Sequence, residues 1–391
     1  MKKKLIDIIE KPVSGEWGED CLDNEGIPVI RTTNFTNEGK LDFKQVVFRN
    51  IKKKDLNHKY LKKGDIIIEK SGGSDKQPVG RVVYFEGQEA KYLFNNFTSV
   101  LRVIDTTIWN SRYVFYSLFV NYQQGGTLAF QNKTTGLHNL KLDKYLKSFE
   151  VVERSHSEQT SVVDKLDKVR NLIESRKEQL EKIDLLVKSQ FIEMFGDLKK
   201  NPKQWTFTPL NVVCDVRDGT HDSPKYYDEG FPLMTSKNFS NGEVDFSDVS
   251  LISKSDFDAI NKRSKVDVGD IVMPMIGTIG HPVIVDTERP FAIKNVALIK
   301  FGNRKISNIF VKAILDSAYF FEIIKSKNRG NTQKFIALGD IRSVGIPNVP
   351  IELQYEFAHF VEQTDKSKFR IKQSLEKLET LKKALMQKYF G

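Results

Sequence analysis

The second half of this 391-residue chain repeats the first half. Four motifs return in the same order: Gly26–Pro28 as Gly230–Pro232, Asn34–Asn37 as Asn238–Asn241, Leu41–Phe43 as Val244–Phe246, and Gly64–Ile67 as Gly269–Val272. The first half closes with Phe195-Gly196, and the second closes with Phe390-Gly391. Internal repetition on this scale predicts two domains of the same fold.

Each half ends in a long series of positions whose steps alternate between three and four residues. The apolar members are Leu166, Val169, Ile173, Leu180, Ile183 and Val187 in the first series, and Val361, Ile371, Leu375, Leu378 and Leu385 in the second. A sustained period of 3.5 residues is typical of a coiled coil. Because the two series lie at equivalent places in a duplicated chain, we expect the two helices to pair with each other.

Capping residues flank both helical series. Ser155 and Glu158 have the spacing of a capping box, in which each side chain bonds to the backbone of the other residue. Pro350 suits the first turn of the second helix, and Gly196 and Gly391 are natural helix terminators. These signals predict where the two helices begin and end.

Polar residues complete the spacing of the two series at Arg176, Gln190, Thr364, Lys368 and Lys382. Charged side chains at core positions cost stability unless they are paired, and they can fix the register. An antiparallel arrangement gives three facing pairs: Leu180 with Leu375, Arg176 with Glu379, and Lys382 with Glu174. Alternatively, some of these polar positions face a third protein.

Short β-branched and aromatic runs precede each long helix. Strands are predicted for Asp65–Ile68, Arg81–Phe85, Gly269–Met273 and Pro282–Val285, and helices for Ser111–Val120 and Asn308–Ile324. The predicted fold class is α+β: two tandem globular domains with curved sheets, each followed by a long helix, the helices forming an antiparallel coiled coil with pseudo-two-fold symmetry. The predicted bounds are residues 1–154 and 197–350 for the domains, and 155–196 and 351–391 for the helices.

Charge and cysteine content limit the class of partner and the compartment. The net charge is +10 and the pI is about 9.2. That balance favours an anionic partner such as nucleic acid or an acidic protein surface, and the alternative is a merely basic, soluble protein. Cys21 and Cys214 are too few for a disulfide framework and have no metal-ligand spacing. We therefore expect a cytoplasmic protein without a signal peptide or a membrane span.

The layout resembles the specificity subunit of Type I restriction-modification systems along the whole chain. The matching residues are Gly219–Pro224, Gly230–Pro232, Thr235–Asn238, Gly269–Ile271, Gly277–Gly280 and Gln354, with Gln159 as the first-half counterpart of Gln354. The resemblance implies two target recognition domains, one for each half of a bipartite DNA site, and no catalytic site in this chain. It also implies two modification subunits and restriction subunits as partners, which would bind S-adenosylmethionine, ATP and magnesium in place of this chain.

The first half departs from the motifs of the second half at two places. The first half has no counterpart of Trp205, and it has Ser71–Ser74 where the second half has Ile276–Thr278. We therefore expect the two domains to bind different DNA sequences. Each domain precedes its helix, so antiparallel pairing would place the domains at opposite ends, roughly 55 Å apart for about 36 residues at 1.5 Å each. That spacing suits half-sites on the order of one to two duplex turns apart.

Polar loop residues are the candidates for DNA contacts. Lys and Arg would contact phosphates and set orientation, whereas contacts with base edges would set sequence. The candidates are Arg31, Thr33, Asn34, Lys70, Ser74, Lys76, Arg81, Gln131 and Lys133 in the first domain, and His221, Lys225, Lys237, Asn238, Thr278, His281, Arg329, Asn331 and Lys334 in the second. The alternative for each is a solvated surface residue. Asn34 and Asn238 are alternatively turn residues, because they occupy equivalent positions of the repeat.

Catalytic motifs are not recognisable in the sequence. It has neither a Gly-x4-Gly-Lys-Ser/Thr phosphate loop nor an Asn/Asp-Pro-Pro-aromatic methyltransferase motif, and its histidines show no metal-ligand spacing. Asp75, Glu89 and Lys91 fit an Asp…Glu-x-Lys nuclease pattern, which arises easily by chance in a chain rich in Lys and Glu. The alternatives to a DNA-reading subunit are a stand-alone nuclease, which would cleave DNA without partners, and an architectural scaffold, which would show no sequence-specific DNA binding.

Overall fold

Two units share the two longest helices of the chain. The computed structural model describes residues 1–21, 25–53, 55–134, 137–239, 242–276, 280–302, 304–327 and 335–391, without the side chains of residues 133 and 134. Unit 1 comprises Met1–Arg176 and Ser374–Gly391, and unit 2 comprises Lys177–Gln373. The long helices α3 (His156–Phe195) and α9 (Ile351–Phe390) therefore each contribute one part to unit 1 and the other part to unit 2.

Unit 1 builds small sheets around the helix α1 (Ser111–Gln123). The strand orders are β2-β10-β6-β8, β3-β5-β4-β9 and β11-β12-β7, and β1 pairs with β13. The strands are β1 (Lys2–Lys4), β2 (Val13–Ser14), β3 (Glu19–Asp20), β4 (Ile27–Ile30), β5 (Val47–Asn50), β6 (Ile66–Glu69), β7 (Ser71–Gly73), β8 (Val82–Tyr84), β9 (Leu93–Phe94), β10 (Thr98–Leu101), β11 (Gln131–Thr134), β12 (Leu137–Leu140) and β13 (Glu150–Val152). The helix α2 (Leu142–Ser148) precedes β13, and short 3-10 turns span Leu5–Asp7, Thr32–Asn34, Asn57–Lys59 and Leu128–Phe130.

Unit 2 repeats this plan. Its strand orders are β15-β21-β18-β19 and β17-β16-β20, and β14 pairs with β22. The strands are β14 (Phe207–Pro209), β15 (Asp215–Asp218), β16 (Phe231–Met234), β17 (Ser250–Ile252), β18 (Ile271–Pro274), β19 (Val283–Ile284), β20 (Ala292–Ile293), β21 (Val296–Lys300) and β22 (Gly345–Pro347). The helices are α4 (Leu210–Val213), α5 (Lys254–Ser264), α6 (Asn308–Leu315), α7 (Ala318–Lys327) and α8 (Leu338–Arg342), with a 3-10 turn at Ser236–Phe239.

Strand pairing confirms that unit 2 duplicates unit 1. β4 pairs in parallel with β9, as β16 does with β20. β10 pairs antiparallel with β6, as β21 does with β18. The predicted α+β class is therefore correct, but each unit holds several small sheets where we expected one curved sheet. The chain passes from one sheet to the next at a tight turn, Asn95–Phe97. β9 before this turn belongs to one sheet, and β10 after it belongs to another.

One predicted helix is two helices. The sequence predicts a single helix over Asn308–Ile324, whereas α6 ends at Leu315 and α7 begins at Ala318. Ser317 causes the break, because its hydroxyl donates to the carbonyl of Ile314 (2.6 Å) and also accepts from the N–H of Phe320 (3.4 Å). A short hydroxyl side chain competes in this way with the helical backbone bonds.

In unit 1, the beginning of α3 packs against the end of α9. Val162 and Leu166 of α3 and Met386 of α9 are buried in one core with α1, whose described residues Arg112–Val120 are all buried. The ring of Phe390 lies 5.1 Å from that of Tyr113, centroid to centroid. The end of one long helix is thus anchored in the domain that precedes the other.

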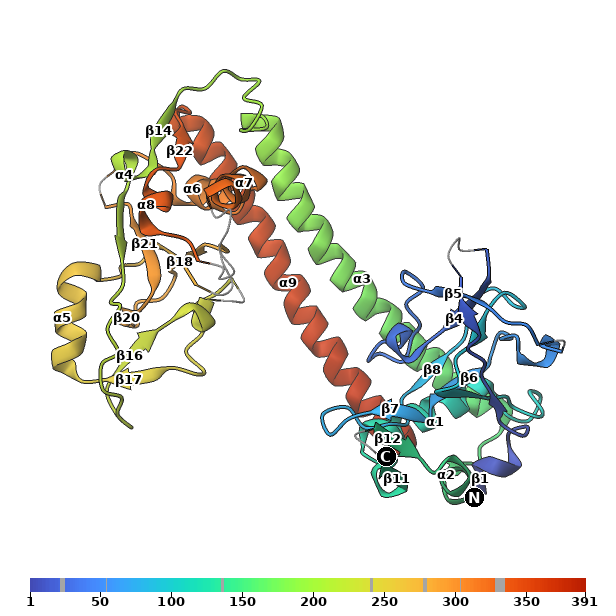
Figure 1. The fold of residues 1–391 in the computed structure, drawn as a ribbon. Helices are drawn as coiled ribbons and strands as arrows, with labels where there is room; N and C mark the ends of the chain where they lie inside the picture. The colour runs from blue at the N-terminus through green and yellow to red at the C-terminus, as the bar shows by residue number, and fades with distance from the viewer. Residues whose placement is uncertain are drawn as a thin grey trace. The chain divides into compact units, whose positions relative to one another are not determined.

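In unit 2, the end of α3 packs against the beginning of α9 (Figure 1). The ring of Phe357 lies 5.5 Å from the rings of both Phe191 and Phe195, and Phe195 lies 4.9 Å from Phe310 of α6. Phe357 lies 195 residues after Val162, and Met386 lies 195 residues after Phe191. The two units therefore pack their long helices through equivalent positions. The helices therefore pair antiparallel in each unit, as the sequence predicts.

The predicted core positions of the coiled coil are buried or half-buried in both helices, whereas Leu172, Leu185 and Phe369 between them are exposed. The positions are Leu166, Val169, Ile173, Leu180, Ile183 and Val187, and Val361, Ile371, Leu375, Leu378 and Leu385. The capping box also forms, since Ser155 N–H donates to Glu158 Oε2 (2.9 Å) and Glu158 N–H donates to Ser155 Oγ (3.3 Å).

The predicted register is wrong by about one helical turn. The ammonium of Lys368 lies 2.6 Å from Oδ1 of Asp184, whereas the predicted register places Lys368 opposite Val187. Glu174, expected near Lys382, instead forms an ion pair with Lys40 of the first domain. In unit 2 the observed register brings the ring of Phe357 against the rings of Phe191 and Phe195.

A buried glutamine ties each long helix to its own domain. Gln159 accepts from the N–H of Asn110 (2.8 Å) and donates to the carbonyl of Ile108 (3.0 Å). Gln354 accepts from the N–H of Ser307 (3.0 Å) and donates to the carbonyl of Val349 (2.9 Å). Asn110 and Ser307 are the N-cap residues of α1 and α6. In both halves the glutamine of the long helix thus accepts a hydrogen bond from the N-cap residue of a domain helix, α1 or α6.

Replacing Phe357 by alanine should destabilise unit 2 by about 3–5 kcal/mol, because a fully buried ring leaves a cavity. Phe369→Ala on the same helix is the matched control, since 61% of Phe369 is exposed, and it should change stability by less than about 0.5 kcal/mol. Denaturant unfolding followed by circular dichroism measures both variants. Equal effects of the two substitutions would contradict the packing described for α9.

Candidate nucleic-acid interface

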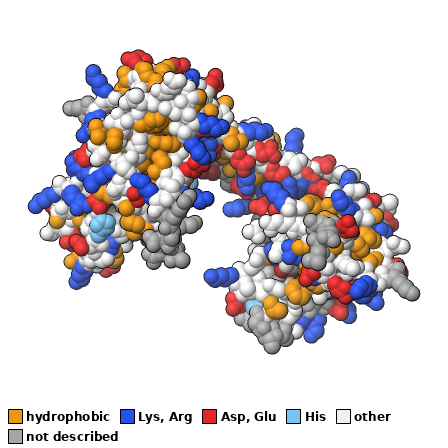
Figure 2. Space-filling view, turned by 45° about the horizontal axis from the view of Figure 1, so that its top comes forward, with side chains coloured by type: hydrophobic (Ala, Val, Ile, Leu, Met, Phe, Trp, Pro, Cys, Tyr) orange, Lys and Arg blue, Asp and Glu red, His pale blue; other side chains and the backbone are white. Residues whose placement is uncertain are grey.

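Basic residues alone do not locate an interface. On the face drawn in Figure 2, Lys and Arg side chains are interspersed with Asp and Glu on both units. The residues that can reach a ligand are therefore sought in the loops at the strand ends.

A glycine follows the first central-sheet strand of each domain. Gly15 N–H donates to the carbonyl of Thr98 in unit 1 (3.4 Å), and Gly219 N–H donates to that of Val296 in unit 2 (3.0 Å). A Cβ atom at either glycine would lie 2.1–2.2 Å from a backbone oxygen, so no other residue fits. The backbone after this glycine therefore starts from an equivalent position in both domains, although the residues that follow differ.

Two of the predicted contact residues stabilise turns. Asn34 and Asn238 are each only 2% exposed. The Asn34 amide donates to the carbonyls of Asp42 (3.0 Å) and Gln45 (3.3 Å), and Asn238 uses its amide in the same way. These bonds use the amide hydrogens that a base contact would need, which favours the turn role that their equivalent positions suggested.

Arg81 and Arg31 also contact their own domain. The guanidinium of Arg81 forms two bonds with buried Glu69 (2.9 and 3.0 Å). Arg31 donates from Nη2 to the carbonyl of Gln45 (3.4 Å), while its buried Nε has no partner in the described part of the chain. Thr33 stands exposed on the same turn. Of these three, Thr33 has the freest access to a ligand.

The other first-domain candidates lie on the segment after β6 and on β11. Ser74 and Lys76 are exposed, and Ser74 closes a tight turn with Gln77. Lys70 donates to the hydroxyl of Ser14 (2.8 Å). Gln131 lies on β11 and contacts the ring of His138 (3.1 Å), and Lys133 is on the same strand, its side chain outside the described part. β12 lies between β11 and β7, so these candidates belong to one small sheet and the loops beside it.

Second-domain candidates lie on several loops. Lys225 is exposed, with its ammonium 5.4 Å from the ring centroid of Tyr227. Lys237 pairs with Asp248 (2.7 Å). His281 is exposed near Asp316 (3.7 Å). The remaining candidates Thr278, Arg329, Asn331 and Lys334 lie outside the described residues.

His221 lies directly after Gly219-Thr220 and has oxygen partners on both ring nitrogens. Nδ1 lies 2.8 Å from Oδ1 of Asn295, and Nε2 lies 2.9 Å from Oδ2 of Asp218. A neutral imidazole can donate from only one nitrogen, so the protonated ring satisfies both contacts. The bonds with Asn295 and then with Asp218 raise the pKa of His221. Arg263 also pairs with Asp218, so the loop presents cations.

Sequence reasoning missed several cations and one aromatic ring at the same loop ends. They are Lys53, Lys59 and Phe97 in unit 1, and Arg263 and Lys294 in unit 2. The run of lysines after β5 was a visible signal for Lys53. The others become noticeable only when strand pairing brings their loops beside Gly15 and Gly219.

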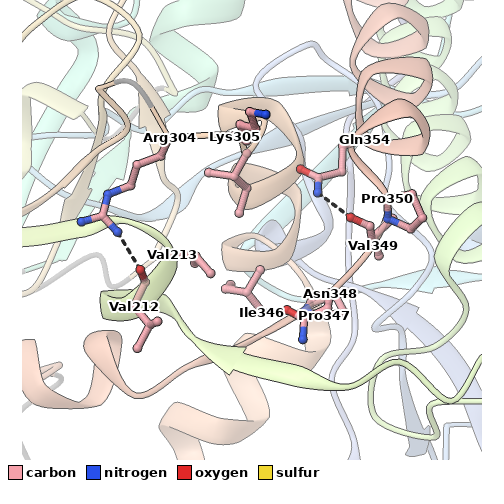
Figure 3. Close-up of a pocket in the computed structure, with 11 residues that line it drawn as sticks. Val212, Val213, Arg304, Lys305, Ile346, Pro347, Asn348, Val349, Pro350 and Gln354 are labelled. Carbon is pink, nitrogen blue, oxygen red and sulfur yellow. Dashed lines mark hydrogen bonds between the residues drawn. The ribbon is translucent and has the colours of Figure 1, made fainter.

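An open pocket of about 610 Å³ lies in unit 2 at the start of α9 (Figure 3). Val212, Val213, Ile346, Pro347 and Val349 supply its apolar wall. Its polar groups are bonded within the chain, since Arg304 donates to the carbonyl of Val212 (2.6 Å) and Gln354 to that of Val349. The described lining includes no carboxylate, thiol or imidazole, so it offers no acid–base pair.

The nuclease-like triplet contacts three different segments. Asp75 lies 3.5 Å from the ring of His138, Glu89 accepts from the N–H of Lys63 (2.9 Å), and Lys91 lies over the ring of Tyr92. Among the described residues, no group of three or more His, Cys, Asp or Glu side chains is placed to hold a metal ion. No helix in the described part of the chain is both long and apolar enough to cross a membrane.

Fold and site define a class: duplicated α+β domains, joined by two antiparallel helices, with basic loops at equivalent strand ends. A family model described as "Type I restriction modification DNA specificity domain" matches residues 1–185 and 202–383. The chain belongs to this family. The resemblance seen in the sequence is thereby confirmed.

Several relatives carry matching names. The specificity subunit of the Type I restriction enzyme EcoBI from Escherichia coli is 25% identical over 266 residues, which are 60% of this chain and 56% of that subunit. The match thus spans little more than half of that relative. The putative MjaX specificity subunit of Methanocaldococcus jannaschii is 22% identical over 98% of this chain and 91% of its own. The EcoKI subunit of Escherichia coli K12 is 22% identical over 96% and 84%.

Solved structures share the fold. The S subunit of a Type I restriction-modification system from M. genitalium superposes with a TM-score of 0.61 at 16% identity, covering 100% of this chain and 96% of that one. A chain from a study of assembly and conformational transition of the type I R-M system gives 0.58 at 14% identity, covering 100% and 97%. At these identities the likeness shows the fold alone.

His221 should titrate above its ordinary value of about 6.5, because its two oxygen partners favour the imidazolium. The protonated ring then contributes stability below about pH 6.5, and this contribution is lost as the pH rises through the raised pKa. NMR titration of the ring measures it. Asp218→Asn should lower the pKa, whereas Asp222→Asn, a neighbouring exposed carboxylate, is the control. An unchanged pKa in Asp218→Asn would contradict the assigned geometry.

Proposed function

We propose that this chain is the DNA-specificity subunit of a Type I restriction-modification complex. Each α+β domain binds one half of a bipartite DNA site in a sequence-specific manner. The chain directs partner subunits that modify and cleave the DNA. Family membership supports this proposal, and the named relatives are specificity subunits. The alternatives of a stand-alone nuclease or a pure scaffold have no comparable support.

One observation carries the proposal: a common backbone frame presents different side chains in the two domains. Gly15 and Gly219 fix the same loop exit. The next residues are Glu16 in unit 1 and Thr220 in unit 2, each donating its N–H to the equivalent strand carbonyl (2.8 and 3.0 Å). Side chains at these exits can therefore change without altering the fold. That is the arrangement required of two domains that recognise different base sequences.

The helices suit the role of a spacer. Each unit holds a different stretch of α3 and of α9, so the chain that connects the two units is helical. A helix of 40 residues does not shorten or stretch as a flexible linker would. In this proposal the base pairs between the two half-sites remain unread, and the helix length sets their number.

Chemistry is assigned to the partners. We place methyl transfer and S-adenosylmethionine on two modification subunits, and ATP, magnesium and cleavage on restriction subunits. This chain then has no catalytic role, and it works in the cytoplasm where its partners and DNA meet.

Exchange of residues 197–350 for the matching segment of another family member tests the modular arrangement. The exchanged chain is expressed with its modification subunits, and the methylated sequences are mapped by long-read sequencing. One half of the methylated site should change and the other half should stay the same, because each domain folds around its own core. A change in both halves would show that the domains do not bind independently. Exchange of 1–154 is the reciprocal control.

A further inference from the structure

Three lysines converge on one loop exit of unit 1. Lys53 Nζ lies 2.8 Å from both carboxylate oxygens of Glu16. Lys59 also pairs with Glu16 and donates to the carbonyl of Ser14 (3.0 Å). Lys70 donates to the hydroxyl of Ser14 (2.8 Å). Lys53 follows β5, Lys59 belongs to the 3-10 turn at Asn57–Lys59, and Lys70 follows β6. Folding therefore brings together three ammonium groups from separate segments.

The cluster carries an excess of positive charge. Three ammonium groups face one carboxylate, that of Glu16, whose side chain is 13% exposed. Burial acts to raise the pKa of Glu16, but the bonds from Lys53 and Lys59 outweigh it and lower the pKa, so the carboxylate stays ionised. The partner of Lys70 is an uncharged hydroxyl. Burial and the nearby Lys59 lower the pKa of Lys70, which shows an ammonium that an additional anion would stabilise.

The surface beside the cluster is open to a large ligand. Gly72 is exposed at a φ of +108°, a conformation that favours glycine. Phe97, which is 40% exposed, lies next to Gly72 and accepts the backbone N–H groups of Lys70 (2.8 Å) and Ser71 (3.2 Å) on its carbonyl. The surface beside the lysines thus presents one exposed aromatic ring and one exposed glycine without a side chain.

The equivalent place in unit 2 has different chemistry. Met275 replaces Lys70, because its carbonyl accepts from Ile336 (2.9 Å) as that of Lys70 accepts from Leu140 (2.8 Å). Asp218 replaces Ser14 and binds both His221 and Arg263. At this place unit 2 thus has a histidine and an arginine sharing a carboxylate, whereas unit 1 has a lysine on an uncharged hydroxyl.

We propose that Lys53, Lys59 and Lys70 form a binding site for the DNA backbone phosphates in the first domain, with Glu16 and Ser14 holding the ammonium groups in place. The site rests on the proposed function and adds to it. It supplies affinity and orientation that do not depend on sequence, and it belongs to one domain only. Lys53 and Lys59 were not among the sequence-predicted contacts.

The test uses the complete chain assembled with its modification subunits. Lys59→Gln and Lys70→Gln should weaken binding several-fold on both the methylated target duplex and an unrelated duplex. Each should also reduce the slope of log affinity against log salt by roughly 0.9 for every phosphate that the variant no longer neutralises. The methylated sequence should remain that of the wild type. Lys144→Gln, an exposed lysine on α2, is the matched control and should change neither slope nor affinity.

Two outcomes would overturn the site while the proposed function stands. One is a wild-type slope and affinity in both variants, with the wild-type complex still bound to its target. The other is a changed methylated sequence, which would make these lysines base contacts. Loss of specific binding by the wild-type complex itself would refute the proposed function as well. Lys53→Gln gives the same readout without disturbing packing, because 64% of that side chain is exposed.

Discussion

Antiparallel packing of α3 against α9 is the interaction on which the rest of the structure depends. In unit 2 the ring of Phe357 packs against the rings of both Phe191 and Phe195, and in unit 1 Val162 and Leu166 share a core with Met386. Each domain core thereby includes the far end of the other long helix. Neither core is complete without residues of both helices.

Within each domain, the frame and the variable positions are separate sets of residues. Gly15 and Gly219, Asn34 and Asn238, and Gln159 and Gln354 keep the same backbone bonds in both halves. The loop exits that follow this frame differ in charge and size, as the lysine cluster of unit 1 and the His221–Asp218 pair of unit 2 show. A duplicated protein can in this way acquire two specificities without altering its fold.

Sequence reasoning predicted the helices, the duplication and the family because all three depend on local periodicity and order. It missed the register, since a 3.5-residue repeat allows several registers and does not show which side chains, such as Phe357 and Phe191, will meet. It also chose contact residues by polarity. Asn34 and Arg81 bond within their own domain to Asp42 and Glu69, which come from other segments, and for Asn34 the repeat had already suggested a turn role. Lys59 was overlooked for the same reason.

Spin labels at two exposed positions of unit 2, Glu193 near the end of α3 and Glu356 near the start of α9, test the central claim most directly. Pulsed electron–electron double resonance should give a short distance between the two labels. That distance is set by helix axes about 8–10 Å apart plus the length of the label side chains. A distance near the full length of the helices, roughly 60 Å at 1.5 Å per residue, would mean parallel or unpaired helices and would contradict the account.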